Sequence, residues 1–432
     1  MNRTELLRRS GMWIETALAG SLPPPVRRFM RIELSMSLAY GVFYASIIPF
    51  TPVVMRRLGA SVDMLALYSS LVYIGSVFTS FSVVLMRRRR TINLIVFCWL
   101  LGRSLFLLTA FIAGAIPLMV IGILLMVLEE FAVPAYTRVI QKIYPETGRG
   151  KAMSAVRLGM VAVILLVTPL AGWALDYAGH QVLFPIGALF GILATYFFMR
   201  IDLDEGQLPP RETKTFADLW QIVRTDGNFA VYLFGNTLFG LGGLLAWPLH
   251  PIVQVDRLQL SYSEIGFLGL IESLTWLLSY LVWGRMIDRR GGLSVVRAIT
   301  AISIVTPLSY MTAQSLWMLI PSAVARGMGM AGFELGRINA GIQLADPDRV
   351  TEYAAIQSTV VGLRGLLTPV VMVGLLRLGV PHNGIFLISA VVLALGWVSF
   401  GWVKAPLPTD EGFGERRKLR YRWPFRRRIT RL

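Results

Sequence analysis

The sequence predicts an all-α membrane protein whose twelve transmembrane helices form two six-helix bundles related by a pseudo-two-fold axis. Of its 432 residues, 55% are hydrophobic and 16% are charged, whereas a soluble domain carries about 25% charged residues. Apolar runs of about 20 residues recur along the chain, and each can cross a hydrocarbon core of about 30 Å. Short motifs of the first half also return about 200 residues later, in the same order.

These repeated motifs indicate that the chain consists of two homologous halves. The segment Pro49 to Pro52 returns as Pro248 to Pro251, and the pair Thr168-Pro169 returns as Thr368-Pro369. A spacing of about 200 residues is too long for the repeats of a solenoid, whose units are typically about 20–50 residues long. It suits two half-molecules that fold into similar bundles.

The apolar runs define twelve candidate spans. Because lipid offers the backbone no hydrogen-bond partner, each span is expected to be a helix. The runs are continuous rather than alternating, which excludes the strands of a membrane β-barrel. In chain order the spans cover residues 33–55, 63–86, 91–113, 116–143, 152–176, 182–201, 228–254, 262–286, 294–313, 316–344, 352–377 and 383–403.

The spans divide the chain into five parts and predict its orientation. Arginine and lysine gather at both termini and in alternate loops, which is typical of the cytoplasmic side of a membrane protein. We therefore expect a multi-pass protein of the cell membrane with both termini cytoplasmic. The predicted parts are an N-terminal cytoplasmic segment (1–32), a first six-helix bundle (33–201), a cytoplasmic central loop (202–227), a second six-helix bundle (228–404) and a basic cytoplasmic tail (405–432).

The formal net charge is +17, and the basic residues lie between the apolar runs and at the termini. This distribution indicates membrane topology rather than nucleic-acid binding. The basic termini either bind anionic lipid head groups or serve only as topology anchors. A single cysteine, Cys98, and three scattered histidines offer no disulfide, no metal-ligand spacing and no catalytic cluster. We expect a monomer with no cofactor, no metal and no enzymatic activity.

Charged residues inside the predicted spans are the strongest candidates for function. Each costs about 2.5–3.5 kcal/mol at the bilayer centre on insertion scales, so it should face a cavity or a partner. A carboxyl group removed from water favours its protonated form and can load and release a proton. The candidates are Glu129 and Glu130 in the fourth span, Glu334 and Arg337 in the tenth, Glu272 in the eighth, Arg103 in the third and Arg364 in the eleventh.

Several of these residues have a structural alternative. Glu334 and Arg337 lie three residues apart on one helix face, where they could form an ion pair. Arg103 and Arg364 could anchor an anionic group or donate hydrogen bonds between helices. Adjacent residues of a helix point about 100° apart, so Glu129 and Glu130 cannot both face one spot. Tyr40 in the first span and Asn236 in the seventh are expected to line a cavity.

The best local motif follows the eighth span. The segment from Gly284 to Gly292 resembles the signature loop of the major facilitator superfamily, glycine-x-x-x-aspartate-arginine-x-glycine, with Gly284, Asp288, Arg289 and Gly291 at the matching positions. The first copy expected of the family, residues 84–90, lacks the glycine and the aspartate. In the tenth span, Arg326 and the glycines after it resemble the arginine-glycine motif of the family's fourth helix.

The resemblance implies a transporter in which spans 1, 4, 7 and 10 line a central cavity and Asp288 latches one closed state. We expect a secondary transporter that works by alternating access and is coupled to protons through carboxylates of the fourth or tenth span. These spans carry few polar residues, which favours a small amphipathic or hydrophobic solute over a sugar. A solute of this kind in turn favours efflux. The alternatives are an uptake carrier for a sugar or organic anion, or a non-transporting receptor or assembly protein derived from a carrier.

Overall fold

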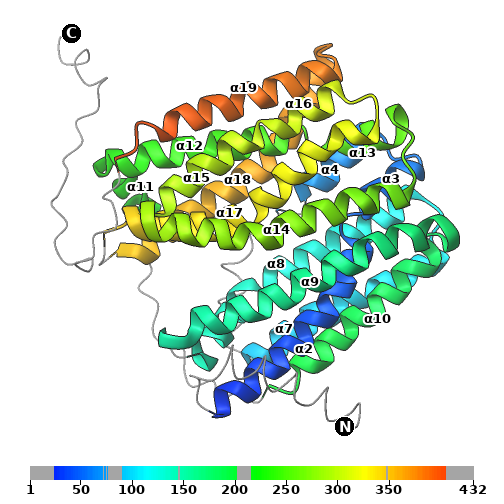
Figure 1. The fold of residues 1–432 in the computed structure, drawn as a ribbon, viewed down its shortest axis with the longest axis horizontal. Coiled ribbons are helices and arrows are strands. Elements are labelled where there is room, and N and C mark those ends of the chain that lie inside the picture. The colour runs from blue at the N-terminus through cyan, green and yellow to red at the C-terminus, as the bar shows by residue number, and fades with distance from the viewer. Residues whose placement is uncertain are drawn as a thin grey trace. The chain divides into compact units, whose positions relative to one another are not determined.

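The computed structural model describes residues 24–71, 73, 75, 90–144, 146–201, 216–346 and 349–404. Most of the N-terminal segment, the first copy of the signature loop apart from residue 90, most of the central loop and the basic tail lie outside the described residues. Within those described, the structure consists of helices and contains no strand, which confirms the all-α fold class (Figure 1).

The predicted spans are recovered as long apolar helices. Ten helical segments of the described chain are long and apolar enough to cross a membrane. They are Val26–Arg57, Thr91–Phe111, Ala115–Ile143, Ala152–Ala178, His180–Phe198, Gly227–Arg257, Tyr262–Arg290, Gly292–Thr312, Glu352–Arg377 and His382–Phe400. The second predicted span is described only in part, as the apolar helix α4 (Val62–Leu71). The tenth is helix α17 (Ile320–Leu344), which carries Arg326, Glu334 and Arg337.

One compact unit, here unit 1, comprises Met1–Ser61, Leu71–Leu208 and Leu260–Ser273. Within it, α2 packs against α9 and α10, and α7 packs against α8 and α10. The buried core includes Ile95, Trp99, Ala132 and Phe198. Its helices are α2 (Pro24–Ile47), α3 (Thr51–Arg57), α7 (Thr91–Leu105), α8 (Ala115–Ile143), α9 (Glu146–Ala178) and α10 (His180–Phe198).

A second compact unit, here unit 2, comprises Val62–Ser70, Pro209–Gln259 and Leu274–Leu432. Here α12 packs against α18 and α19, and α15 packs against α17 and α19. Phe229, Tyr232, Tyr353 and Phe400 belong to its core. Besides α4 and α17, its helices are α11 (Phe216–Thr225), α12 (Gly227–Leu245), α13 (His250–Ile252), the later part of α14 (Tyr262–Arg290), α15 (Gly292–Ser303), α16 (Val305–Thr312), α18 (Val350–Arg377) and α19 (His382–Phe400).

The two units repeat the same packing scheme, as the repeated sequence motifs predict. The contacts of α2 with α9 and α10 correspond to those of α12 with α18 and α19. The contacts of α7 with α8 and α10 correspond to those of α15 with α17 and α19. Pro169 inside α9 and Pro369 inside α18 occupy matching places, since each belongs to a repeated Thr-Pro pair. The duplication is therefore structural as well as sequential.

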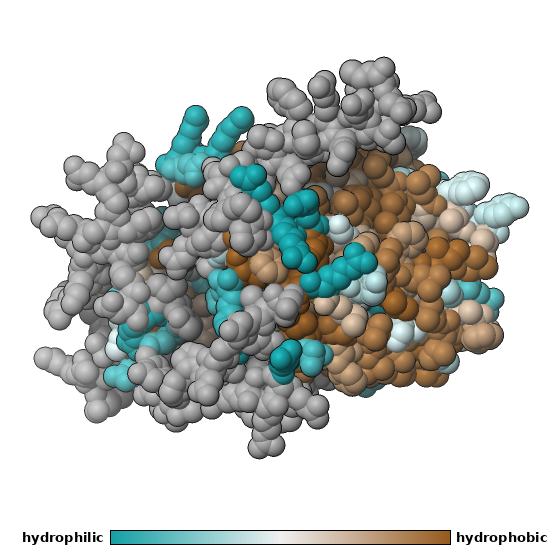
Figure 2. All heavy atoms as spheres, turned by 90° about the horizontal axis from the view of Figure 1, so that it is seen from below, coloured by the Kyte–Doolittle hydropathy of each residue, from teal (hydrophilic) through white to brown (hydrophobic). Residues whose placement is uncertain are grey.

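Large apolar side chains remain on the surface of the helices. Phe111, Leu166 and Leu281 are among the most exposed of them. Figure 2 shows a broad hydrophobic area of this kind on one face of the molecule. Soluble monomers rarely expose contiguous apolar patches larger than a few hundred Å². An apolar surface of this extent is instead compatible with contact to lipid.

Candidate functional site

An ion pair between two neighbouring helices lies at the centre of the candidate site in unit 1. Arg103 of α7 donates from Nε to Oε1 of Glu129 of α8 over 2.8 Å. The Arg103 side chain is 2% exposed and the Glu129 side chain is 19% exposed. The structure thus pairs two predicted site residues, and Glu129 is the partly exposed member of the pair.

Two further contacts hold the Arg103 guanidinium in place. Its Nη1 atom donates to the Thr195 hydroxyl over 2.9 Å and to the Gly191 carbonyl over 3.2 Å, both on α10. Gly191 permits this approach, because a Cβ there would lie 2.7 Å from the Phe43 ring and 3.1 Å from Arg103 Cδ. Three helices therefore meet at one guanidinium, which makes use of the planar fork of donors that arginine offers.

Aromatic rings complete the surroundings of Arg103. Its Cζ atom lies 4.8 Å from the centre of the Tyr40 ring and 4.6 Å from that of Trp99. Rings at these distances stabilise a cation electrostatically. Tyr40, a predicted cavity residue, is half-buried beside the Arg103–Glu129 pair. The neighbouring Glu130 is exposed, which agrees with the expectation that adjacent glutamates of a helix cannot share one spot.

In unit 2 the predicted site residues contact several different elements. Glu334 of α17 accepts the Tyr280 hydroxyl of α14 over 2.6 Å, and Trp276 donates to that hydroxyl over 3.1 Å. The Arg337 guanidinium lies over the Phe333 ring, 5.4 Å from its centre. Glu334 thus has a hydroxyl partner on another helix, while Arg337 contacts a ring of its own helix.

Arg364 and Asn236 join α18 to α12. The Nη1 atom of Arg364 donates to the backbone carbonyl of Asn236 and, over 3.3 Å, to its side-chain Oδ1. Both side chains are buried. Gly240, one turn beyond Asn236, makes room for the guanidinium, because a Cβ there would overlap Arg364 Nε. The structure therefore shows Arg364 as a donor between helices, one of its two predicted roles.

The signature loop forms the junction between α14 and α15. Gly291 caps the start of α15 with a φ of 78°, a left-handed conformation that favours glycine. A Cβ at Gly291 would also overlap the Gln343 side chain of α17. Asp288 and Arg289 are exposed, Gly284 is half-buried in α14, and Arg326 is half-buried in α17. The latch role of Asp288 stays a prediction. Glu272 is half-buried in α14.

A buried carboxylate that sequence reasoning missed lies in α2. Glu33 is 3% exposed, and its two oxygens accept the hydroxyls of Tyr136, in the last part of α8, and of Tyr144, the C-cap residue of that helix. Glu33 stands at the first position of the predicted span 33–55, and it was not among the charged residues predicted to be functional. The signal that could have found it is an acidic residue within an apolar pattern that α2 begins nine residues earlier, at Pro24.

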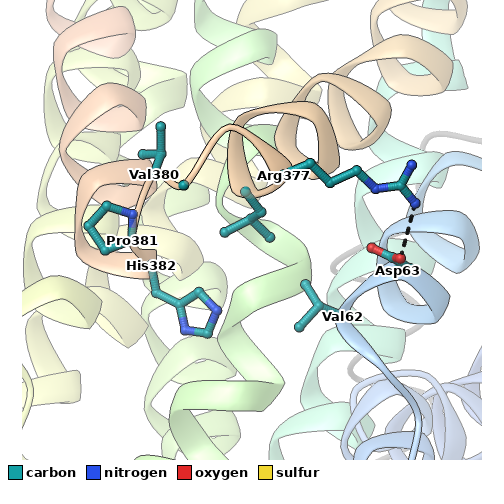
Figure 3. Close-up of a pocket in the computed structure, with 8 residues that line it drawn as sticks. Val62, Asp63, Arg377, Val380, Pro381 and His382 are labelled. Atoms are coloured by element: carbon teal, nitrogen blue, oxygen red, sulfur yellow. Dashed lines mark hydrogen bonds and ion pairs between the residues drawn. The ribbon is translucent and has the colours of Figure 1, made fainter.

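A surface hollow of about 550 Å³ lies in unit 2. It is lined by Val62 and Asp63 of α4 and by residues 376, 377 and 379–382 around the end of α18. Figure 3 shows Asp63 and Arg377 pointing toward each other across its rim, where they form an ion pair of 3.3 Å. None of the predicted site residues lines this hollow.

Comparisons with known proteins agree with this architecture. The family model for the Major Facilitator Superfamily matches residues 34–247 and 232–430. A mutant of the nucleoside transporter NupG shares the fold with a TM-score of 0.70 at 11% identity, over 86% of this chain and 98% of that one. A bacterial homologue of the human lysosomal transporter Spinster, inward-facing and occupied, has a TM-score of 0.62 at 13% identity, over 88% and 97%. No curated protein matches the sequence closely.

Proposed function

Because the family model matches both halves, the chain belongs to the major facilitator superfamily, and we propose that it moves a small amphipathic or hydrophobic solute out of the cell. We infer that the two six-helix bundles, 33–201 and 228–404, alternately open a central site to each side. Protons moving down their gradient through buried carboxylates drive the cycle. The chain lies in the cell membrane with both termini cytoplasmic, where the basic tail meets anionic lipid.

The observation that carries this proposal is the buried Arg103–Glu129 ion pair inside apolar helices. Replacing a buried ion pair with apolar residues of similar volume is often neutral or stabilising, so folding alone does not require one. Charged residues inside membrane spans usually mark the path of a solute or a proton. Glu129 combines a fixed cationic partner with partial exposure, which suits a residue that meets a solute or exchanges a proton.

The side chains around the pair support an amphipathic solute. Tyr40, Phe43 and Trp99 surround the Arg103 guanidinium with rings. Such a surface offers apolar contact together with a single charged pair. A sugar would instead be recognised by several amide and hydroxyl groups placed together. NupG is a nucleoside transporter, and nucleosides are small solutes with an aromatic face, so adenosine is a useful competitor.

Purified protein in liposomes tests the proposal. Ethidium serves as the apolar cationic probe, with an imposed pH gradient and a trapped pH-sensitive dye that reports protons. We expect ethidium to move against its gradient while protons move the opposite way. The matched variants are Glu129→Gln, which should abolish the flux, and Glu352→Gln, which removes a carboxylate paired with Arg349 at 2.7 Å and should retain it.

Two results would contradict parts of the proposal. Flux of ethidium that neither responds to the pH gradient nor moves protons would remove proton coupling. Absence of flux for ethidium and adenosine alike, in protein that stays folded, would favour the receptor or assembly role. Cells that make the protein should accumulate less ethidium than cells that make the Glu129→Gln variant, and equal accumulation would count against efflux.

A further inference from the structure

Glu33 of unit 1 accepts hydrogen bonds from two tyrosine hydroxyl groups. Oε1 accepts the Tyr136 hydroxyl over 2.5 Å, and Oε2 accepts the Tyr144 hydroxyl. We propose that Glu33 is the residue of unit 1 that takes up and releases the coupled proton. This inference deepens the proposed function and rests on it for the transport step, while proton binding itself can be measured without transport.

Several other described carboxylates lie beside a cation or at a helix N-terminus. Glu129 is paired with Arg103, and Glu352 is paired with Arg349. Asp226 caps the start of α12, accepting the backbone N–H of Phe229. A carboxylate beside a fixed cation or at a helix N-terminus gains energy by staying ionised. Glu33 differs from these groups because both of its oxygens accept tyrosine hydroxyls.

The surroundings of Glu33 can accept both of its charge states. A tyrosine hydroxyl is both a donor and an acceptor, so it can donate to a carboxylate or accept from a carboxyl group. Among the described residues, Tyr136 of α8, Tyr144 at the C-cap of α8 and Arg157 of α9 are the titratable or charged groups that act on Glu33. In either state both Glu33 oxygens keep a hydrogen-bond partner, whereas a buried polar atom without one costs about 1–3 kcal/mol.

The proton step is an addition to one carboxylate oxygen. As the proton binds Oε2 and forms an O–H bond, the Tyr144 hydroxyl rotates its own hydrogen away and accepts the new one. Release reverses both movements, and no other covalent bond forms or breaks. Tyr144 is the C-cap residue of α8, so the Glu33 site lies at the end of the helix that we predict to be cytoplasmic.

A chain of direct contacts joins Glu33 to the ion pair. The Tyr136 ring lies 5.7 Å from the Trp99 ring, measured between centres. The Trp99 ring lies under the Arg103 guanidinium, which binds Glu129. A change of charge at Glu33 alters the hydrogen bond of Tyr136 and thereby acts on the packing beneath Arg103. This contact chain is the physical route by which protonation at Glu33 would influence a solute at Glu129.

Infrared difference spectroscopy over a pH titration of the reconstituted full chain tests proton binding without any solute. We expect a carboxyl C=O band that appears on acidification, is absent in Glu33→Gln and is unchanged in Glu352→Gln. In Tyr144→Phe the band should persist at a changed frequency, because the carboxyl group then lacks the hydrogen bond that the Tyr144 hydroxyl accepts. Persistence of the whole band in Glu33→Gln would overturn the proposal.

Ethidium flux then separates the two claims. If Glu33 carries the coupled proton, Glu33→Gln stops flux driven by a pH gradient but retains exchange of ethidium across the membrane at equal pH. A merely structural Glu33 would lose both fluxes in proportion, which would overturn the coupling role. A titrating band that belongs to Glu33, in protein that moves neither ethidium nor adenosine, would refute the proposed function and leave the proton site standing.

Discussion

Replacing Arg103 tests whether the ion pair of unit 1 is energetically coupled. Arg103→Met keeps a long apolar side chain but removes the guanidinium that binds Glu129, Thr195 and the Gly191 carbonyl. Removing one partner of a buried pair costs about 3–5 kcal/mol. Because Glu129 is 19% exposed, water can partly solvate the remaining carboxylate, which places the expected cost near the lower end, about 3 kcal/mol.

The assay is reversible unfolding in mixed micelles with increasing dodecyl sulfate, applied as a double-mutant cycle. Glu129→Gln in the Arg103→Met background should recover about 2 kcal/mol, since no buried charge then remains unpaired. Arg377→Met is the matched control, because the Arg377–Asp63 pair is 75% and 59% exposed and such pairs contribute about 0–1 kcal/mol. Equal costs for Arg103→Met and Arg377→Met, or a coupling energy below about 0.5 kcal/mol, would refute the reasoning.

Two glycine pairs test close packing by the same unfolding assay. Gly240→Ala should cost about 1–3 kcal/mol of stability, because the added Cβ overlaps Arg364. Gly243→Ala places its Cβ in open space and should stabilise the helix by up to about 1 kcal/mol. Equal effects of the two variants would disprove the overlap. Gly291→Ala should lower the stability more than Gly379→Ala. Both glycines have a positive φ, but of the two only Gly291 also lies against a side chain. Similar losses would mean that backbone strain of about 1–2 kcal/mol is the whole effect.

The helices were predictable because they depend on local composition. A run of apolar residues becomes a helix in lipid whatever lies beside it, since the backbone must satisfy its own hydrogen bonds. The duplication was readable for the same reason, because pairs such as Thr168-Pro169 and Thr368-Pro369 are local patterns. The matching packing of α2 with α10 and of α12 with α19 then follows from homology of the halves.

The partners of the buried charges were not predictable from the sequence. Arg103 and Glu129 were recognised as intramembrane charges, but their pairing depends on how α7 and α8 are rotated about their axes. Glu33 was missed because its partners lie 103 and 111 residues away in the chain. No short pattern encodes such distances, so helix rotation and register decide which hydroxyl meets which carboxylate.

Proton movement driven by a solute gradient tests the central claim most directly. Liposomes containing the full chain are loaded with ethidium at equal pH on both sides, and a trapped pH-sensitive dye follows protons after dilution. The account predicts that the outward ethidium gradient drives protons inward, and that neither Glu129→Gln nor Glu33→Gln shows this movement. Ethidium efflux with no proton movement in the unaltered protein would contradict it.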